Sequence, residues 1–271
     1  MDFLEILKAF IHGVVQGITE WLPISSTGHL IILDNIWPMK EPAFFEMFKV
    51  VIQFGSILAV CVLFFHKLNP FSSKKTEDDK RRTFSLWAKV FVGILPAMVM
   101  GLLFDDFIEE KLSMPYVISI TLIVYGILFI IMESKKRVSK MDTLDVLDYK
   151  TAFLIGCFQV LALIPGTSRS GATILGGVLL GCSRYVASEF SFFLAVPVMF
   201  GASALKVLKF GLAFTFEQVL VLIVGTTVSF LVSVLAIRLL LGYIRKHDFK
   251  IFGYYRIVLG VIVLLYFYLL K

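Results

Sequence analysis

The hydrophobic positions of this chain fall into long continuous runs that few charged residues interrupt. Six of these runs approach the roughly 20 residues that an α-helix needs to cross a hydrocarbon core of about 30 Å. They cover residues 50–65, 90–104, 116–132, 190–205, 219–241 and 254–270. The pattern therefore predicts an all-α polytopic membrane protein with six transmembrane helices.

Two polar segments, QGITEWLPISSTGH at 16–29 and QVLALIPGTSRSGAT at 159–173, depart from this pattern. In each, a short apolar arm leads to a break that contains proline (Pro23 or Pro165), and a second short arm follows. Neither arm is long enough to span a bilayer, and non-helical backbone at membrane depth is tolerated only where protein or a wet cavity surrounds it. We therefore expect two re-entrant helical hairpins, which occupy residues 1–33 and 151–181.

The two hairpins resemble each other. Gly13-x-x-Gln16 matches Gly156-x-x-Gln159, and the two proline-containing breaks align after a shift of one residue. Similar halves that enter from opposite faces are typical of inverted-topology repeats, whose sites lie near the midplane between paired broken helices. We expect one integral membrane domain over 1–271, with repeat one at about 1–132 and repeat two at about 151–271.

Composition supports the membrane assignment and removes one alternative. Charged residues make up 17% of the chain, against roughly 25% in soluble domains, and hydrophobic residues make up 58%. The net charge of +6 would suit a nucleic acid in a soluble protein, but in a membrane protein basic residues usually report topology, so no nucleic-acid partner is expected. The three cysteines lack metal-binding spacing and are expected to be packing residues.

The basic residues are concentrated in three stretches. Residues 66–89 carry seven Lys or Arg, 133–150 carry five and 242–256 carry four, whereas 105–115 carry one and 206–217 carry two. The positive-inside rule places the three basic stretches in the cytoplasm and both termini outside. This topology requires each hairpin to enter and leave on one side, the first from outside and the second from inside.

The first polar segment offers an anion site and a nucleophile. Three hydroxyl residues follow Pro23 and precede an apolar arm, a pattern that predicts a helix start with unpaired N–H groups: Ser25, Ser26 and Thr27. Ser26 can cap this helix or attack phosphorus, and His29 can serve as its base or as an acid for the leaving group. For Ser25, simple capping is the preferred interpretation.

Glu20 lies four residues after Gln16, so both side chains share one helical face. A lone carboxylate in this Trp- and Leu-rich hairpin costs several kcal/mol unless it is paired or binds a metal. Glu20 can hold a divalent cation against phosphate oxygens, or it can act as a general acid or base. A structural ion pair with Arg169 is the alternative.

The second polar segment suits phosphate binding. Pro165-Gly166 breaks the helix, and Arg169 supplies a planar guanidinium for bidentate contact with phosphate. Hydroxyl groups flank this arginine at Ser168, Ser170 and Thr173.

These motifs resemble those of a known family. The stretches GVVQGITEWLPISSTGHLII, GCFQVLALIPGTSRSGATILGG and SRYVASEFSFFLAVPVMFGA are similar to the undecaprenyl-diphosphate phosphatases, the bacitracin-resistance family of integral membrane phosphatases. The resemblance covers essentially the whole chain. It implies removal of the terminal phosphate of undecaprenyl diphosphate, which recycles a carrier lipid for cell-wall synthesis. It also implies six spanning helices with two re-entrant hairpins, a bacterial cell membrane, a site open to the extracytoplasmic side, a divalent cation (Mg²⁺ or Ca²⁺) and a homodimer.

The resemblance also implies a role for each polar position. The nucleophilic serine of the family falls on Ser26, its essential histidine on His29 and its phosphate-gripping arginine on Arg169. The metal motif falls on Gln16 and Glu20; other members often carry Glu at the first position, so Glu20 is expected to do most of the metal binding. The expected phosphate-binding set is Ser25, Thr27, Ser168, Ser170 and Thr173.

The expected reaction is an in-line displacement at the terminal phosphorus, with Ser26 attacking and a phosphoserine then hydrolysed. Direct attack by water, with Ser26 only binding phosphate, is the mechanistic alternative. A lipid transporter or flippase is the second functional hypothesis because broken helices in inverted repeats are also a transporter architecture. Ser26 close to His29 favours the enzyme, and a channel would leave the polar cluster unexplained.

Overall fold

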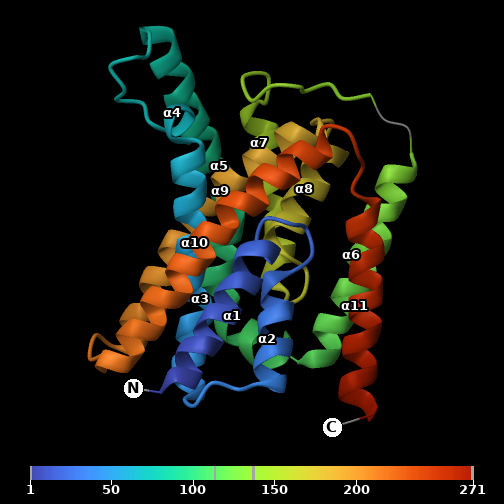
Figure 1. Cartoon of the computed structure of the whole chain (residues 1–271). Helices are drawn as coiled ribbons and strands as arrows, with labels where there is room; N and C mark the ends of the chain where they lie inside the picture. Colours follow the sequence, from blue (N-terminus) through green and yellow to red (C-terminus); the bar gives the residue numbers. More distant parts are fainter. Residues whose placement is uncertain (1, 113, 136–137, 270–271) are drawn as a thin grey trace.

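The computed structural model describes residues 2–112, 114–135 and 138–269 (Figure 1). In this part of the chain, all regular structure is helical apart from one isolated β-bridge between Met141 and Cys182. The helices are α1 (Phe3–Thr19), α2 (Ser26–Ile36), α3 (Pro42–Leu63), α4 (Phe65–Leu68), α5 (Glu77–Leu112), α6 (Pro115–Ser134), α7 (Tyr149–Val160), the 3₁₀ turn η1 (Leu161–Leu163), α8 (Arg169–Leu179), α9 (Arg184–Phe210), α10 (Phe216–Ile244) and α11 (Lys250–Leu269).

Six helices are long and apolar enough to cross a membrane, and each overlaps one of the six predicted runs: α3, α5, α6, α9, α10 and α11. Most extend beyond those runs because the helical hydrogen-bond ladder continues into flanking polar residues. α5, for example, begins at Glu77 with three acidic residues in its first turn, which favour the positive end of the helix dipole. The chain is a multi-pass membrane protein.

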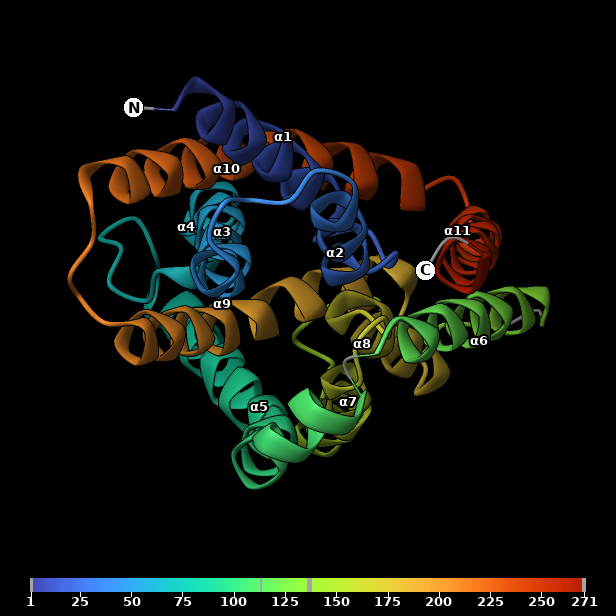
Figure 2. The same cartoon turned by 90° about the horizontal axis from the view of Figure 1, so that it is seen from below.

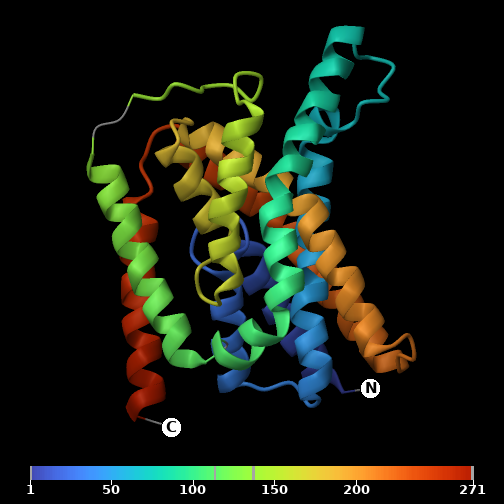
Figure 3. The same cartoon turned by 180° about the vertical axis from the view of Figure 1, so that it is seen from behind.

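The remaining long helices form two hairpins. α1 and α2 are joined by the turn at 20–25, and α7 with η1 is joined to α8 by the turn at 164–168. Both turns lie inside the bundle, and the open ends of the two hairpins face opposite ends of the molecule (Figures 1 and 3).

The helices pack in matching pairs across the molecule. α1 crosses α10 and α7 crosses α5, while α6 lies along α11 and α3 contacts α9 (Figure 2). Glycines bring the backbones together at the first two crossings. A Cβ added to Gly13 would lie 2.7 Å from the carbonyl oxygen of Gly225, and one added to Gly156 would collide with the carbonyl of Gly93. Such contacts are typical of membrane helices, whose association depends on close packing.

The basic stretches meet at one end of the bundle, but one of their residues does not belong there. The connections at 69–76, 138–148 and 245–249 lie at one end of the bundle, and α1 and α11 have their free ends at the other (Figure 1). Arg256, which the charge count assigns to the basic stretch 242–256, instead lies inside α11 and is fully buried. That part of the prediction is wrong, because α11 begins at Lys250 and turns Arg256 toward the interior, where backbone carbonyl groups accept its hydrogen bonds.

Candidate active site

The breaks in the two hairpins have the same local geometry. Ser25 and Ser168 both adopt left-handed backbone conformations, with φ values of 73° and 74°. Each side chain caps the following helix, accepting a hydrogen bond from Gly28 N at 3.3 Å or Gly171 N at 3.1 Å. A left-handed serine is strained, and such strain clusters at functional sites. Both hydroxyls, predicted to bind phosphate, are engaged as helix caps.

These caps expose two helix starts. The residues in the first two positions of α2 and α8 have backbone N–H groups without a partner inside their helices. They are Ser26, Thr27, Arg169 and Ser170. Helix starts of this kind favour anions. Thr27, predicted to bind phosphate, remains partly exposed at the start of α2.

Glu20 is the centre of the polar cluster. Its Oε1 lies 3.0 Å from Arg169 Nη2, and its Oε2 accepts hydrogen bonds from Ser26 Oγ at 2.7 Å and from Gln16 Nε2 at 2.9 Å. The fold therefore brings together four of the predicted residues from both hairpins. The ion pair between Glu20 and Arg169, which the sequence left as an alternative, is present.

The Arg169 guanidinium is oriented by α9. Its Nη1 donates to the carbonyl oxygen of Ser191 at 2.7 Å, and its Cζ lies 5.4 Å from the centre of the Trp21 ring. The Nε atom is buried without a hydrogen-bond partner among the described residues. Leaving a buried charged donor without a partner is costly, so an anion that accepts a hydrogen bond from Nε would be stabilised in the site. Sequence reasoning missed Ser191, and its only signal is a polar residue in an apolar stretch.

Ser170 and Thr173 join elements of the framework. Ser170 Oγ donates to the carbonyl oxygens of Glu20 at 3.1 Å and Leu22 at 3.2 Å, which ties the second hairpin to the first. Thr173 Oγ1 lies 2.7 Å from Ser191 Oγ and donates to the carbonyl of Arg169 at 2.9 Å. Both side chains are buried, so their present contacts are structural.

His29 has different partners from those expected. Its Nδ1 lies 2.7 Å from the carbonyl oxygen of Ser25, which can only accept, so the network assigns the ring proton to Nδ1. Nε2 then accepts from the Tyr255 hydroxyl, also at 2.7 Å. In the described residues, no hydrogen bond joins His29 to Ser26. The helical spacing places the two close together, but the serine hydroxyl turns to Glu20 instead.

Arg256 holds both hairpin breaks from α11. Its Nη1 donates to the carbonyl oxygen of Pro23, and its Nη2 donates to those of Gly166 and Thr167, all at 3.0 Å. The guanidinium also lies over the Tyr125 ring, with 5.4 Å between Cζ and the ring centre. Sequence reasoning missed this role although the signal existed, because an arginine within an apolar run is costly and usually functional.

The cluster has the oxygen donors that Mg²⁺ or Ca²⁺ prefers. Gln16 Oε1 is buried without a hydrogen-bond partner in the described residues, beside the Glu20 carboxylate and the Ser26 hydroxyl. Across these residues, no group of three or more His, Cys, Asp or Glu side chains is arranged to hold a metal. Hard cations often take remaining ligands from water and substrate phosphates, so this small donor set fits one.

Comparisons with known proteins show the family of this chain. The family model of bacitracin resistance protein BacA matches residues 9–262. Undecaprenyl-diphosphatase of Enterococcus faecalis is 56% identical over 270 residues, with 98% of both chains covered. The enzyme of the same name from Acetivibrio thermocellus is 56% identical, with 97% of this chain and 98% of the relative covered. Undecaprenyl-diphosphatase 1 of Clostridioides difficile is also 56% identical, covering 99% of this chain and 98% of the relative. With a match across nearly its whole length, this chain belongs to the bacitracin resistance protein BacA family.

Proposed function

We propose that this chain is a membrane hydrolase that converts undecaprenyl diphosphate to undecaprenyl phosphate and inorganic phosphate. This activity recycles the carrier lipid for cell-wall synthesis and gives bacitracin resistance. The observation that carries the proposal is the contact of Glu20 with both Ser26 and Arg169, which joins a hydroxyl, a carboxylate and a guanidinium from two hairpins. Two relatives of 56% identity are named undecaprenyl-diphosphatase, and the matches cover 98% of their length.

In the proposed first step, Ser26 attacks the terminal phosphorus. Its hydroxyl already donates to Glu20 Oε2 at 2.7 Å, so the carboxylate is positioned to take the proton as the oxygen–phosphorus bond forms. The phosphoanhydride bond breaks, and undecaprenyl phosphate leaves. Glu20 passes this proton to the leaving undecaprenyl phosphate and is then free to remove a proton from the water that hydrolyses the phosphoserine. It returns that proton to the Ser26 oxygen as inorganic phosphate is released. Direct attack by water, with Ser26 as a phosphate ligand, uses the same base.

Several donors are available for the negative charge that spreads over the transferred phosphoryl group. Arg169 Nε has no partner among the described residues, and the helix starts at Ser26 and Arg169 supply backbone N–H groups. Fixed donors in a water-poor site are effective because they need little reorganisation during the reaction. His29 would donate a proton to the leaving phosphate only as the imidazolium, in which Nε2 gains a proton and no longer accepts from Tyr255, while Nδ1 still donates to the Ser25 carbonyl.

A divalent cation is part of the proposal. Gln16 Oε1 and the Glu20 carboxylate would hold it. When bound, it would neutralise phosphate oxygens and so lower the repulsion between the substrate and this carboxylate.

We further propose that the two hairpins are re-entrant and that the chain consists of inverted repeats. Gly13 and Gly156 lie at equivalent helix crossings, and Ser25 and Ser168 have nearly equal φ values at equivalent caps. The members of each pair are separated by the same number of residues. The basic stretches at one end of the bundle support a cytoplasmic placement of that end, with the site opening to the extracytoplasmic side.

The test is phosphate release from undecaprenyl diphosphate by the purified protein in detergent, with and without chelator, beside R169A, S26A and E20Q. We expect cation-dependent release that all three substitutions abolish. Activity that persists in S26A alone would favour direct attack by water, whereas a ³²P-labelled protein trapped from the terminal phosphate would favour the phosphoserine. A folded protein that binds the lipid without releasing phosphate would favour the transporter.

A further inference from the structure

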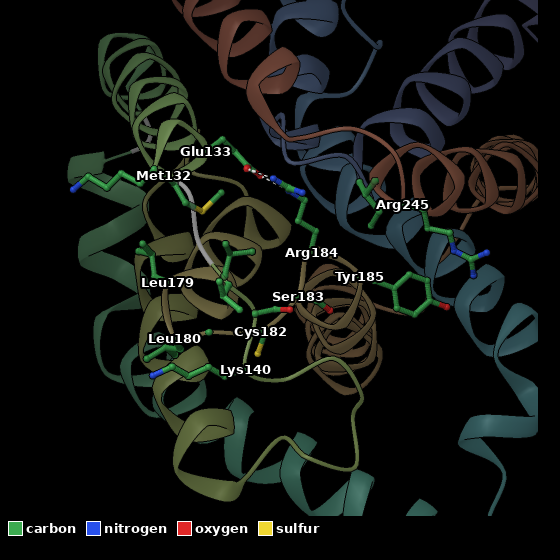
Figure 4. A pocket seen from close by; sticks show the side chains of 16 residues that line it. Met132, Glu133, Lys140, Leu179, Leu180, Cys182, Ser183, Arg184, Tyr185 and Arg245 are labelled. Carbon is green, nitrogen blue, oxygen red and sulfur yellow. Dashed lines mark hydrogen bonds and ion pairs between the residues drawn. The ribbon is translucent and has the colours of Figure 1, made fainter.

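A cavity of about 870 Å³ lies away from the polar cluster, at the end of the bundle that carries the basic stretches. Its walls come from the end of α6, the connection at 138–140, the turn between α8 and α9, and the end of α10 (Figure 4). None of the cluster residues from Gln16 to Arg169 lines it. It is therefore a site separate from the proposed chemistry.

The cavity has a surplus of positive charge. Its lining includes four cations, Lys135, Lys140, Arg184 and Arg245, and one carboxylate, Glu133. Arg184 engages that carboxylate through two hydrogen bonds, from Nε at 2.8 Å and from Nη2 at 2.6 Å, and Phe249 N also donates to it at 3.2 Å. Among the described residues, the other three cations have no carboxylate partner.

Stabilisation of helix ends explains only part of this charge. Lys135 and Arg245 are the C-cap residues of α6 and α10, where a cation favours the negative end of a helix dipole. Lys140 belongs to no helix, and Arg184 is the first residue of α9, where a cation opposes the dipole. Glu133 matches the charge of Arg184 but not that of Lys140, so the cavity keeps an uncompensated positive charge that an anionic occupant would neutralise. The unpaired N–H groups at the start of α9 also favour an anion in this cavity.

The apolar part of the lining indicates a lipid and not a soluble anion. Val138 is 90% exposed and Leu179 is 39% exposed on the rim, while Met132 and Val178 form buried wall. The cavity also lies at the ends of α6 and α10, two of the spanning helices, and hence near the membrane interface. A free phosphate would leave this apolar surface in water, whereas the acyl chains of a lipid would cover it.

We propose that this cavity binds the phosphate headgroup of an anionic phospholipid from the leaflet on the side of the basic stretches. Lys140 and Arg245 border the cavity on opposite sides (Figure 4) and attract the phosphate by their charge, and the exposed Val138 and Leu179 contact the first part of the acyl chains. Basic pockets between membrane helices on the cytoplasmic side are suited to such headgroups, at a gain of about fivefold in affinity for each cation.

The test is native mass spectrometry of the purified full chain in detergent with added phosphatidylglycerol or phosphatidylcholine of the same acyl chains. We expect wild type to retain phosphatidylglycerol at concentrations at least about tenfold lower than phosphatidylcholine. The double variant K140Q/R245Q should lose about 25-fold in affinity for phosphatidylglycerol, since two cations are removed. The matched control K74Q/K246Q changes the net charge equally at exposed residues that do not line the cavity, and should bind as wild type does.

Three results would overturn the proposal. They are equal retention of both lipids by wild type, an equal loss in the control variant, and displacement of phosphatidylglycerol by millimolar inorganic phosphate, which would assign the cavity to a free anion. Because all four substituted residues are exposed, the variants should fold. Lipid retention is measured without substrate, so its outcome is independent of the proposed phosphatase activity.

Discussion

The Glu20 carboxylate and the Arg169 guanidinium lie 3.0 Å apart although 149 positions separate them in the chain. Each belongs to a different hairpin, so the pair forms only when both hairpins meet. Burying two charges is costly unless the pair has good geometry and further hydrogen bonds, and Ser26, Gln16 and Ser191 supply those bonds here. The pair is consequently both a tertiary contact and the core of the proposed site.

Replacing Glu20 with Gln should abolish most of the phosphate release while leaving the fold intact. The amide keeps the size of the side chain but cannot take the proton of Ser26, and loss of a general base typically lowers kcat by about 10²- to 10⁴-fold. The control is E46Q, since Glu46 is a half-exposed carboxylate that pairs with Lys49 on the surface. Equal kcat values for E20Q and wild type would exclude Glu20 as the base.

Arg256→Lys should lower both stability and activity. A lysine keeps the charge, but its single nitrogen cannot take the places of both Nη1 and Nη2, which donate to different hairpin breaks. Each buried carbonyl left without a partner costs about 1–3 kcal/mol. We expect a lower Tm in detergent and a lower kcat. Arg238→Lys, at an exposed position on α10, is the matched control and should change neither. A full wild-type kcat in R256K would show that the clamp does not position the catalytic groups.

Tyr255→Phe should lower kcat by about fivefold, which corresponds to the loss of one hydrogen bond of about 1 kcal/mol to His29 Nε2. The neighbouring Tyr254 is 56% exposed, so Y254F is a control that removes a hydroxyl from the same helix. Initial rates at saturating lipid give the comparison. If Y254F and Y255F behave alike, the hydrogen bond to His29 has no part in the reaction.

The left-handed serines should respond unusually to glycine. Ser168→Ala removes the cap and costs about 1 kcal/mol of stability. Ser168→Gly costs less, because glycine is tolerated at N-cap positions, and it also relieves the backbone strain. We expect the glycine variant to be at least as stable as wild type and the alanine variant to have a lower Tm. Ser183 is an N-cap with an ordinary φ of −62°, so the difference in Tm between its glycine and alanine variants should be smaller. An equal difference in Tm between the glycine and alanine variants at both positions would mean that the backbone of Ser168 is not strained.

Cys182 should be unreactive at neutral pH. Burial raises the pKa of this thiol to about 11, and the nearby Asp148 carboxylate adds to the increase. Maleimide reacts with the thiolate, so labelling at pH 7 should be roughly 100-fold slower than for an ordinary thiol and should rise as the pH approaches 11. The C61A/C157A variant isolates Cys182, and its counterpart C61A/C182A isolates the exposed Cys157. Rapid labelling of folded C61A/C157A at pH 7 would contradict the prediction.

The six spanning helices could be predicted from sequence because length and hydropathy are local properties, and 219–241, for example, lies wholly inside α10. The start of α2 could also be predicted, since hydroxyl residues after a proline are typical of a helix cap, and Ser25 is that cap. Properties that depend on one segment alone, such as a spanning helix or a helix start, could therefore be predicted from the sequence.

Apart from the pair of Glu20 with Arg169, which the sequence offered as an alternative, the side-chain contacts of the site were not visible in the sequence. The hydroxyl of Ser26 has two neighbours of suitable chemistry, and only the folded arrangement selects Glu20 over His29. Arg256 was assigned to a basic connection because charge counts ignore where a helix begins and which way each residue faces. Tyr255 and Ser191 carry no signal of their own, since their roles arise from the hairpins that happen to approach them.

The Arg256 clamp also has a consequence for biogenesis. Both hairpin breaks are synthesised long before α11, and a nascent chain that has inserted as far as α10 still lacks the donor to Pro23, Gly166 and Thr167. α11 must insert and dock against α6 before Arg256 can hold both breaks. Assembly of the site therefore waits until α11 has been synthesised, and a chain interrupted before Lys250 would reach the membrane without a completed centre.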